Sequence, residues 1–333
     1  MNATSTVTFK RRPVGRPVAD DFEIIHGPPP EPADGEVLVA SRYVSIDPYV
    51  RTQVDPANPY GEPLALGATI PGDIAGEVIA SRHDDWPEGS FVIGRLGWTS
   101  YALSNGADLR VLDISLGPLP LHLGVFSSSG LTDYFGMLEI GRPAAGETVL
   151  VSGAAGAVGT IASQLARIKG ARVIGIAGDP TKCAFLTDEC VLHGAIDYRA
   201  ADDFGATLDK LCPEGIDVYF YNVGGPMTDE VMRHLARHAR VVVCGESSQY
   251  DAGGNEFKPG ILGPLMDTRA TMTGLLVSDF TERYDEGRTE LARLVKSGDL
   301  KHRQDIVKGL ENAPAAFIGM LAGANIGKRM VEV

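Results

Sequence analysis

Residues 146–160 read Gly-Glu-Thr-Val-Leu-Val-Ser-Gly-Ala-Ala-Gly-Ala-Val-Gly-Thr. The pattern predicts a buried strand over Thr148–Val151, a turn with three glycines over Gly153–Gly159, and a helix over about Thr160–Lys169. At the start of a helix, unpaired N–H groups and the helix dipole favour phosphate, and glycine lets a ligand approach the backbone closely. The spacing is Gly-x-x-Gly-x-x-Gly rather than the commoner Gly-x-Gly-x-x-Gly, so this stretch alone leaves open a plain glycine-rich turn.

The composition is that of a soluble globular protein. The length of 333 residues suits two domains, because domains commonly run to about 100–200 residues. A formal net charge of −13 disfavours nonspecific binding to nucleic acid and to anionic membrane surfaces. No apolar run approaches the roughly 20 residues of a membrane span, and the N-terminus has no apolar signal region, so we expect a cytoplasmic protein.

The cysteines and histidines do not form a recognisable set of metal ligands. No cysteine belongs to a Cys-x-x-Cys pair, so the spacing supports neither structural nor catalytic zinc and predicts reduced, mostly buried thiols. The cysteines are Cys183, Cys190, Cys212 and Cys244. His234 and His238 lie one turn apart on a helix predicted over Met227–His238, which fits a metal pair, but no third ligand is evident. We therefore expect no metal site.

The first third of the chain consists of short β-type runs separated by Pro and Gly. This spacing predicts an antiparallel, partly barrel-like β domain. The runs are Phe22–His26, Val37–Tyr43, Ile74–Ser81 and Phe91–Gly97.

From Gly124 onward, predicted strands and helices alternate. Strands that are apolar throughout and separated by single helices indicate a parallel sheet covered on both faces, and hence a doubly wound α/β domain. Further strands are predicted at Arg172–Ala177, Ala195–Tyr198, Gly215–Asn222, Ala239–Gly245 and Arg269–Ser278. Helices are predicted at Ser129–Ile140, Pro180–Cys190, Asp202–Leu211, Met227–His238 and Thr281–Ser297.

The last elements are predicted to return to the β domain. They are a strand over 303–308, a helix over Asn312–Leu321 and a strand over Lys328–Val333. We therefore expect a β-rich substrate domain formed by 1–125 and 303–333, with a dinucleotide-binding domain at 126–302 inserted in it. In that context the opening glycine turn lies on the first strand of a repeated βαβ pattern, where a dinucleotide pyrophosphate binds.

The end of the second α/β strand indicates which dinucleotide is bound. An acid at this point bonds the ribose 2′-hydroxyl of NAD, whereas here Gly178 leaves room for a 2′-phosphate and Lys182 can bring a positive charge to it. Asp179 is either the NAD-selecting acid or the N-cap of a helix that has Pro180 at its first position, and we favour the cap. Tyr198, just past the next strand, either stacks near the adenine or simply packs. These residues favour NADP.

Several motifs, spread over essentially the whole chain, together indicate a protein family. They are Val44–Arg51, Gly130–Gly141, Gly153–Gly159, Tyr221–Gly225, Gly245–Tyr250 and Gly309–Phe317. Through them the chain resembles the zinc-independent branch of the medium-chain dehydrogenase/reductase superfamily, and within it the leukotriene hydroxydehydrogenase/prostaglandin reductase group. That group includes plant double-bond reductases and bacterial curcumin reductases.

The resemblance implies an NADPH-dependent reductase that acts without metal on the carbon–carbon double bond of α,β-unsaturated ketones and aldehydes. It also implies a Rossmann domain inserted in a GroES-like β domain, and a homodimer.

The resemblance further implies the residues of the cofactor site. It assigns phosphate contacts to Gly156, Ala157, Val158 and Gly159, and 2′-phosphate contacts to Lys182 and Tyr198. The rest of the implied site is Asn222, Cys244, Gly245, Glu246, Ser247, Ser248, Gln249, Tyr250, Leu275, Leu276, Val277 and Asn325. The residues themselves leave open that Asn222 is a strand-end turn residue and that Asn325 caps a loop.

Two positions depart from the pattern of the group. Tyr221 stands where the group usually has Asp or Glu before Asn-Val-Gly-Gly, and Asp133 replaces a small residue in the usual Thr-Ala-Tyr-Phe-Gly run. The first departure puts the substrate in question more than the fold.

Reduction of an enone builds negative charge on the carbonyl oxygen, and a protein without zinc must stabilise it with a hydrogen-bond donor. The resemblance points to Tyr60 as that donor, with Tyr49 and Tyr250 as second candidates. The alternative for Tyr60 is a loop residue that packs on its neighbouring proline. Asp47 and Arg51 suggest a proton relay, but we favour a structural role for them, as a buried ion pair or as turn capping. The substrate itself cannot be read from the sequence, and a quinone reductase and a non-catalytic NADPH-binding protein remain alternatives.

Overall fold

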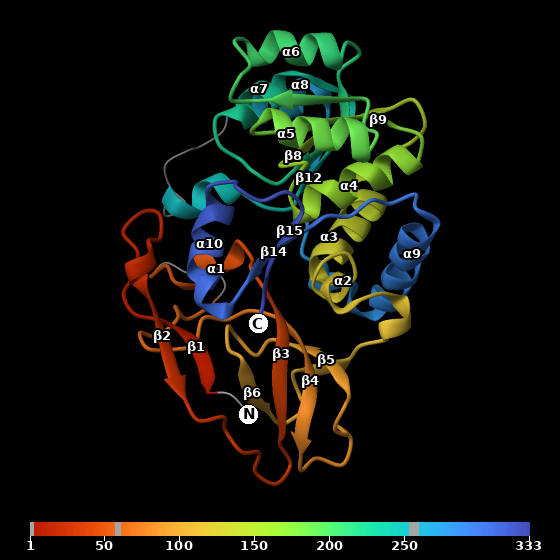
Figure 1. The fold of residues 1–333 in the computed structure, drawn as a ribbon. Coiled ribbons are helices and arrows are strands. Elements are labelled where there is room, and N and C mark those ends of the chain that lie inside the picture. Colours follow the sequence, from red (N-terminus) through yellow and green to blue (C-terminus); the bar gives the residue numbers. More distant parts are fainter. Residues whose placement is uncertain (1–2, 57–60, 253–259) are drawn as a thin grey trace. The chain divides into compact units, whose positions relative to one another are not determined.

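The structure is a computed structural model that describes residues 3–56, 61–252 and 260–333. It divides the chain into two compact units (Figure 1). One unit combines Met1–Gly124 with Gln304–Val333, and the other is Val125–Arg303, which interrupts the first in the sequence.

The unit Val125–Arg303 contains a 6-stranded parallel sheet in the order β10-β9-β8-β11-β12-β13. Its strands are β8 (Thr148–Ser152), β9 (Arg172–Ala177), β10 (Gly194–Asp197), β11 (Ile216–Tyr221), β12 (Leu235–Val243) and β13 (Thr271–Gly274). The chain runs outward from β8 in one direction and then from β11 in the other, so the strand order reverses between these two neighbours. The predicted doubly wound α/β fold is confirmed.

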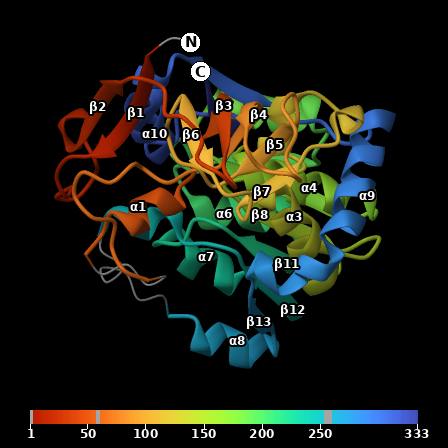
Figure 2. The same cartoon turned by 90° about the horizontal axis from the view of Figure 1, so that it is seen from below.

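Helices precede, connect and follow these strands. They are α3 (Ser128–Phe135), α4 (Ala157–Ile168), α5 (Pro180–Ala184), α6 (Phe204–Leu211), α7 (Met227–Arg233), α8 (Leu262–Thr268) and α9 (Tyr284–Ser297). Figure 2 shows α3 and α4 on one side of β8, β11 and β12, and α7 on the other. Because both faces of the sheet are covered, β8 is buried along its whole length, as its unbroken apolar sequence predicts.

The helix expected over Met227–His238 is wrong in its second half. The helix α7 ends at Arg233, and Leu235 already pairs with Ile216 of β11. Leu, Ala and Arg favour helices locally, but pairing with the neighbouring strand outweighs that preference here. His238 has a φ of 68° within β12. The two histidines therefore do not share a helix face, and the metal pair suggested by their spacing is not formed.

Two predicted helices have nearly the predicted bounds but end in π-helical turns, and one predicted strand is shorter than expected. The helix predicted over Pro180–Cys190 continues after α5 as a π-helical turn, Phe185–Glu189. The helix predicted over Ser129–Ile140 likewise passes from α3 into a π-helical turn, Gly136–Gly141. The last strand of the sheet covers only Thr271–Gly274, so the predicted strand residues after it lie outside the sheet.

The other unit is built on a mixed 7-stranded sheet in the order β14-β15-β3-β4-β5-β7, with β6 paired to β3. Its strands are β3 (Val37–Ser45), β4 (Ile74–Ser81), β5 (Phe91–Gly94), β6 (Tyr101–Ser104), β7 (Leu109–Val111), β14 (Gln304–Lys308) and β15 (Lys328–Glu332). A separate hairpin pairs β1 (Thr4–Phe9) with β2 (Phe22–Gly27), and the helices are α1 (Tyr49–Gln53), α2 (Leu119–Leu123) and α10 (Ala313–Leu321).

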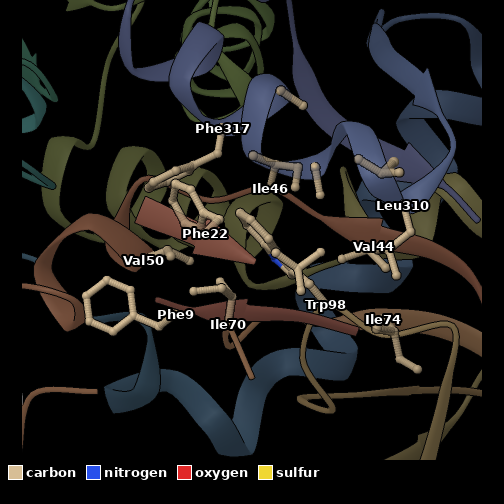
Figure 3. Packing of buried hydrophobic residues seen from close by; sticks show 14 of the residues in the cluster. Phe9, Phe22, Val44, Ile46, Val50, Ile70, Ile74, Trp98, Leu310 and Phe317 are labelled. Atoms are coloured by element: carbon tan, nitrogen blue, oxygen red, sulfur yellow. The ribbon is translucent and has the colours of Figure 1, made fainter. Parts of the chain in front are cut away.

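The core of this unit packs around Trp98, which is fully buried (Figure 3). The ring of Phe317, from α10, meets Trp98 edge to face at 5.7 Å between centroids, and Phe22 lies 6.3 Å away. The indole Nε1 of Trp98 donates to the backbone oxygen of Ser45 at 3.2 Å. A polar group buried in this core is thus satisfied by the end of β3.

Candidate cofactor site

The glycine turn after β8 is packed tightly against the start of α4. Gly156 is the N-cap of α4, and Gly153 has a φ of 61°, in the left-handed region that glycine tolerates best. A Cβ atom on Gly159 would lie 2.4 Å from the backbone oxygen of Gly153 and 2.7 Å from the Cα of Ala154. Only glycine at 159 lets the helix begin so close to the turn.

The first turn of α4 has the chemistry of an anion site. Ala157, Val158 and Gly159 are its first three residues, and N–H groups at the start of an α-helix have no partner within the helix. With the dipole of a 12-residue helix behind them, these groups favour negative charge. The turn also lies where the strand order reverses, between β8 and β11. The turn therefore fits a dinucleotide pyrophosphate.

The end of β9 carries the residues predicted to distinguish NADP from NAD. Asp179 is the N-cap of α5, and its Oδ1 accepts a hydrogen bond from the backbone N–H of Lys182 at 2.9 Å, so the predicted cap is confirmed. The Nζ of Lys182 lies 3.9 Å from Oδ2 of Asp179. A Cβ on Gly178 would lie 3.0 Å from a ring carbon of Tyr198. The structure thus brings Gly178, Lys182 and Tyr198 to one sheet end.

Asn222 joins the ends of β8 and β11. Its backbone N–H donates to Oγ of Ser152 at 2.9 Å, and its side-chain Nδ2 donates to the backbone oxygen of Ser152 at 3.0 Å. The backbone N–H of Ser247 donates in turn to the oxygen of Asn222 at 3.2 Å. Asn222 therefore serves as a strand-end turn residue, whatever it also binds. Ser152, which the sequence analysis missed, is the last residue of β8 and is fully buried.

Tyr221 forms a hydrogen bond that the family pattern did not indicate. Its hydroxyl donates to Oε1 of Glu246 at 2.6 Å. Burial, and then the carboxylate of Glu246, raise the pKa of Tyr221. A Cβ on Gly224, which has a φ of 76°, would lie 3.0 Å from the Tyr221 hydroxyl oxygen. The pair therefore ties the turn after β11 to the segment after β12.

The remaining residues of the segment after β12 lie beside this pair. The N–H of Ser248 donates to the oxygen of Val223, and Gln249 is buried. A Cβ on Gly245 would lie 3.4 Å from the hydroxyl oxygen of Tyr250. The stretch 244–250 thus packs against the turn after β11 at the carboxyl edge of the sheet.

Other predicted cofactor residues are more scattered. Leu275 donates its N–H to the oxygen of Val243 at 2.9 Å, just past the end of β13. Leu276 is 59% exposed, and Val277 begins a 3-10 turn that runs to Arg283. Asn325 belongs to the other unit, where its Nδ2 donates to the oxygen of Gly327 at 2.8 Å as a loop cap. Tyr60 lies outside the described residues.

Asp133, the second departure from the family pattern, is completely buried on α3. Neither of its carboxylate oxygens has a hydrogen-bond partner in the described part of the chain. Burial raises its pKa well above the ordinary value, and the nearby backbone N–H of Ala162 offsets this only in part. Burial, followed by the charge of Asp133, also raises the pKa of the Cys244 thiol. The unit thus carries a fully buried titratable group that is close enough to Cys244 to act on its thiol.

In the β-rich unit, Asp47 and Arg51 do not pair with each other, and each belongs to a separate ion pair. Asp47 forms a buried ion pair with Lys328. Arg51 instead bonds Asp55 at 3.2 Å and the backbone oxygen of Gly15 at 3.0 Å.

Tyr49, the second candidate for a hydrogen-bond donor, packs within the β-rich unit. It lies against the core of that unit, under the guanidinium of Arg95 at 5.0 Å from its ring centre. Burial raises the pKa of its hydroxyl.

Across 3–56, 61–252 and 260–333, no three His, Cys, Asp or Glu side chains gather closely enough to hold a metal ion. No helix in these ranges is long and apolar enough to cross a membrane. A groove of about 590 Å³ lies at α3, α4 and α9, where Leu165, Ile168 and Leu294 contribute to its wall. It involves the far end of α4 from the glycine turn, so it is not part of the cofactor edge.

Two family profiles match the chain. One, described as the N-terminal domain of oxidoreductase, covers residues 5–112, and one, described as zinc-binding dehydrogenase, covers residues 157–294. YfmJ of Bacillus subtilis, to which an NADP-dependent oxidoreductase activity is ascribed, is 44% identical over 98% of this chain and 97% of its own length. The NADPH-dependent curcumin reductase of Escherichia coli is 37% identical over 97% of this chain and 94% of its own length.

Solved structures also resemble this chain. CurA from Vibrio vulnificus in complex with NADPH is 38% identical, with a TM-score of 0.93 over 99% of each chain. The quinone oxidoreductase of Escherichia coli, at 21% identity and a TM-score of 0.80, shares the fold. The chain belongs to the medium-chain dehydrogenase/reductase superfamily, in the zinc-independent group that contains the curcumin and prostaglandin reductases. The family predicted from the sequence is confirmed.

Proposed function

We propose that this oxidoreductase uses NADPH to reduce the carbon–carbon double bond of α,β-unsaturated ketones and aldehydes. The observation that carries the proposal is the carboxyl edge of the sheet in Val125–Arg303. There, the tight turn at Gly159, Lys182 shortly after the end of β9, and the hydrogen bonds of Asn222 lie at the ends of neighbouring strands. Similarity over the full length to curcumin and prostaglandin reductases supports the substrate class.

Different residues of this edge bind different parts of NADPH. The first turn of α4 holds the pyrophosphate, and Lys182 with Tyr198 holds the 2′-phosphate. Asn222 and the pair of Tyr221 with Glu246 fix the two turns against which the nicotinamide end is oriented. When bound there, NADPH supplies a hydride.

The chain must also stabilise the substrate as it accepts that hydride. An enone that accepts a hydride at its β-carbon gathers negative charge on its carbonyl oxygen, and a positioned donor lowers the barrier. We assign this role to the hydroxyl of Tyr60, on the family resemblance alone. The α-carbon of the resulting enolate then takes a proton from water, which completes the saturated ketone or aldehyde.

Replacing Tyr60 by Phe is expected to lower kcat on an enone by about 10- to 100-fold, because one donor to the developing oxyanion is lost. The Kd for NADPH should stay unchanged, since the phenol does not bind the cofactor in this account. Steady-state kinetics and fluorescence titration measure the two quantities. Tyr101→Phe, a change in β6, serves as the matched control, and an unaltered kcat for Tyr60→Phe removes this residue from the mechanism.

The experiment that tests the function is NADPH oxidation measured against a panel of enones, enals and 1,4-quinones, with NADH in parallel. We expect the enones or enals to be turned over fastest, and NADPH to be preferred. Faster turnover of quinones would make the protein a quinone reductase instead. NADPH binding without oxidation by any acceptor would make it a non-catalytic binding protein.

We further propose that the enzyme acts as a cytoplasmic homodimer on a small-molecule substrate, as the family resemblance implies. Light scattering coupled to gel filtration should give twice the chain mass of 35.3 kDa. A particle of the mass of one chain would reject the dimer.

A further inference from the structure

The pairing of β10 with β9 places two consecutive side chains beside Gly178. In this parallel pair Asp197 is the partner of Ala177, and the N–H of Tyr198 donates to the oxygen of Ala177 at 3.1 Å. The chain therefore leaves the sheet at Tyr198 and Arg199, next to the end of β9. This is the position at which the fold normally presents the acid that binds the ribose of NAD.

Both side chains fold back over Gly178. A Cβ on Gly178 would lie 3.0 Å from Cε1 of Tyr198, 3.3 Å from Nε of Arg199 and 3.4 Å from its Cζ. Nε of Arg199 donates to the hydroxyl of Tyr198 at 3.2 Å, and its guanidinium carbon lies 5.6 Å from the centre of that ring. The tyrosine thus orients the guanidinium, and the glycine leaves room for it.

The neighbouring acids do not neutralise this guanidinium by direct contact. Oδ1 of Asp179 caps α5, and its Oδ2 lies 3.9 Å from Nζ of Lys182. Oδ1 of Asp197 accepts from the backbone N–H of Arg199 at 3.0 Å. Within the described residues, the side chain of Arg199 donates a hydrogen bond to Tyr198 alone. Both aromatic and guanidinium groups are exposed, so a ligand can reach them.

We propose that Arg199 is a specificity-determining residue that binds the adenosine 2′-phosphate of NADPH together with Lys182. A planar guanidinium can form two parallel hydrogen bonds to a phosphate, which an ammonium cannot match in geometry. Because the chain has a net charge of −13, a local cation such as this one is needed to attract the negatively charged 2′-phosphate. The proposal rests on the proposed function for the identity of the cofactor, and it is independent of the substrate.

The test measures binding of 2′,5′-ADP and 5′-AMP to the full chain by calorimetry, in wild type, Arg199→Gln and Arg199→Lys. These probes differ only in the 2′-phosphate. Arg199→Gln should weaken 2′,5′-ADP by about 10- to 100-fold, the effect of losing charged hydrogen bonds, and should leave 5′-AMP within about twofold. Arg199→Lys should keep part of the affinity, because the charge remains but the paired geometry is lost.

Arg237→Gln, an exposed arginine elsewhere in the same unit, is the matched control and should change neither affinity. Thermal unfolding of each variant shows that it is folded. Unchanged binding of 2′,5′-ADP by Arg199→Gln, or an equal loss for both nucleotides, would overturn the proposal while leaving the proposed function intact. If wild type bound 5′-AMP as tightly as 2′,5′-ADP, both the role of Arg199 and the choice of NADPH would fall.

Discussion

Gly159→Ala is expected to bind NADPH at least about 10-fold more weakly than wild type, a loss of about 1.4 kcal/mol. The added Cβ would lie 2.4 Å from the backbone oxygen of Gly153 and within 2.9 Å of its carbonyl carbon. These atoms belong to the backbone of the turn and cannot rotate away, so the start of α4 must lift from the turn. The N–H groups that we propose to bind the pyrophosphate then lose their alignment.

The same overpacking should lower the stability of the apoprotein by about 1–3 kcal/mol. Fluorescence titration with NADPH and thermal unfolding without it separate the two effects. Gly263→Ala is the matched control, because a Cβ on this residue of α8 meets nothing within 4 Å and alanine favours a helix. An affinity of Gly159→Ala within twofold of wild type would contradict the role assigned to this turn.

Asp133→Ala is expected to raise the Tm of the apoprotein by about 2–10 °C near neutral pH. A buried polar group without a partner costs about 1–3 kcal/mol, and each kcal/mol moves Tm by about 2–4 °C in a domain of this size. Both oxygens of Asp133 lack a partner among the described residues. The family resemblance also implies a small residue at this position. The small cavity left by the carboxyl group offsets part of the gain.

The gain should depend on pH in a defined direction. Burial raises the pKa of Asp133 in the folded protein, whereas in the unfolded chain it is about 3.9. Below about pH 4 the carboxyl is neutral in both the folded and the unfolded chain, so its burial carries no cost of ionisation. As the pH rises from there through the raised folded-state pKa, the stability of wild type falls, because the unfolded chain ionises more readily than the folded protein. The difference in Tm between Asp133→Ala and wild type should therefore widen as the pH rises.

Two further variants serve as controls for the effect of Asp133→Ala on Tm. Asp133→Asn keeps the size and the unpaired polar atoms but cannot ionise, so its stability should lose the pH dependence that Asp133 causes. Asp202→Ala removes an exposed carboxylate and should change stability by less than about 0.5 kcal/mol. A Tm for Asp133→Ala that equals or falls below that of wild type at every pH would contradict the reading of Asp133 as a destabilising group.

The α/β architecture was readable from the sequence because its strands are buried on both faces. An unbroken apolar run such as Val149–Val151, followed by a glycine turn, has few alternatives once a helix follows it. The segment after α7 was misread because residues 235–238 have helical composition, and only pairing with Ile216 makes them a strand. Local propensity could not supply that contact.

The site was predictable where one local segment supplies it. The Asp179 cap and the glycine turn each follow from a few consecutive residues. The partners of Asp47 and Tyr221 did not follow, because Lys328 lies 281 residues from Asp47 and Glu246 lies 25 residues from Tyr221. Arg199 was missed because an exposed arginine after a strand is unremarkable until the strand register sets it beside Gly178.

The most direct test of the central claim is to follow deuterium from NADPH labelled at the nicotinamide C4 carbon, on either face, into an enone such as benzylideneacetone. We predict a saturated ketone with deuterium at the former β-carbon, identified by NMR and mass spectrometry. An allylic alcohol with deuterium at the former carbonyl carbon, or no transfer from either labelled face, would contradict it.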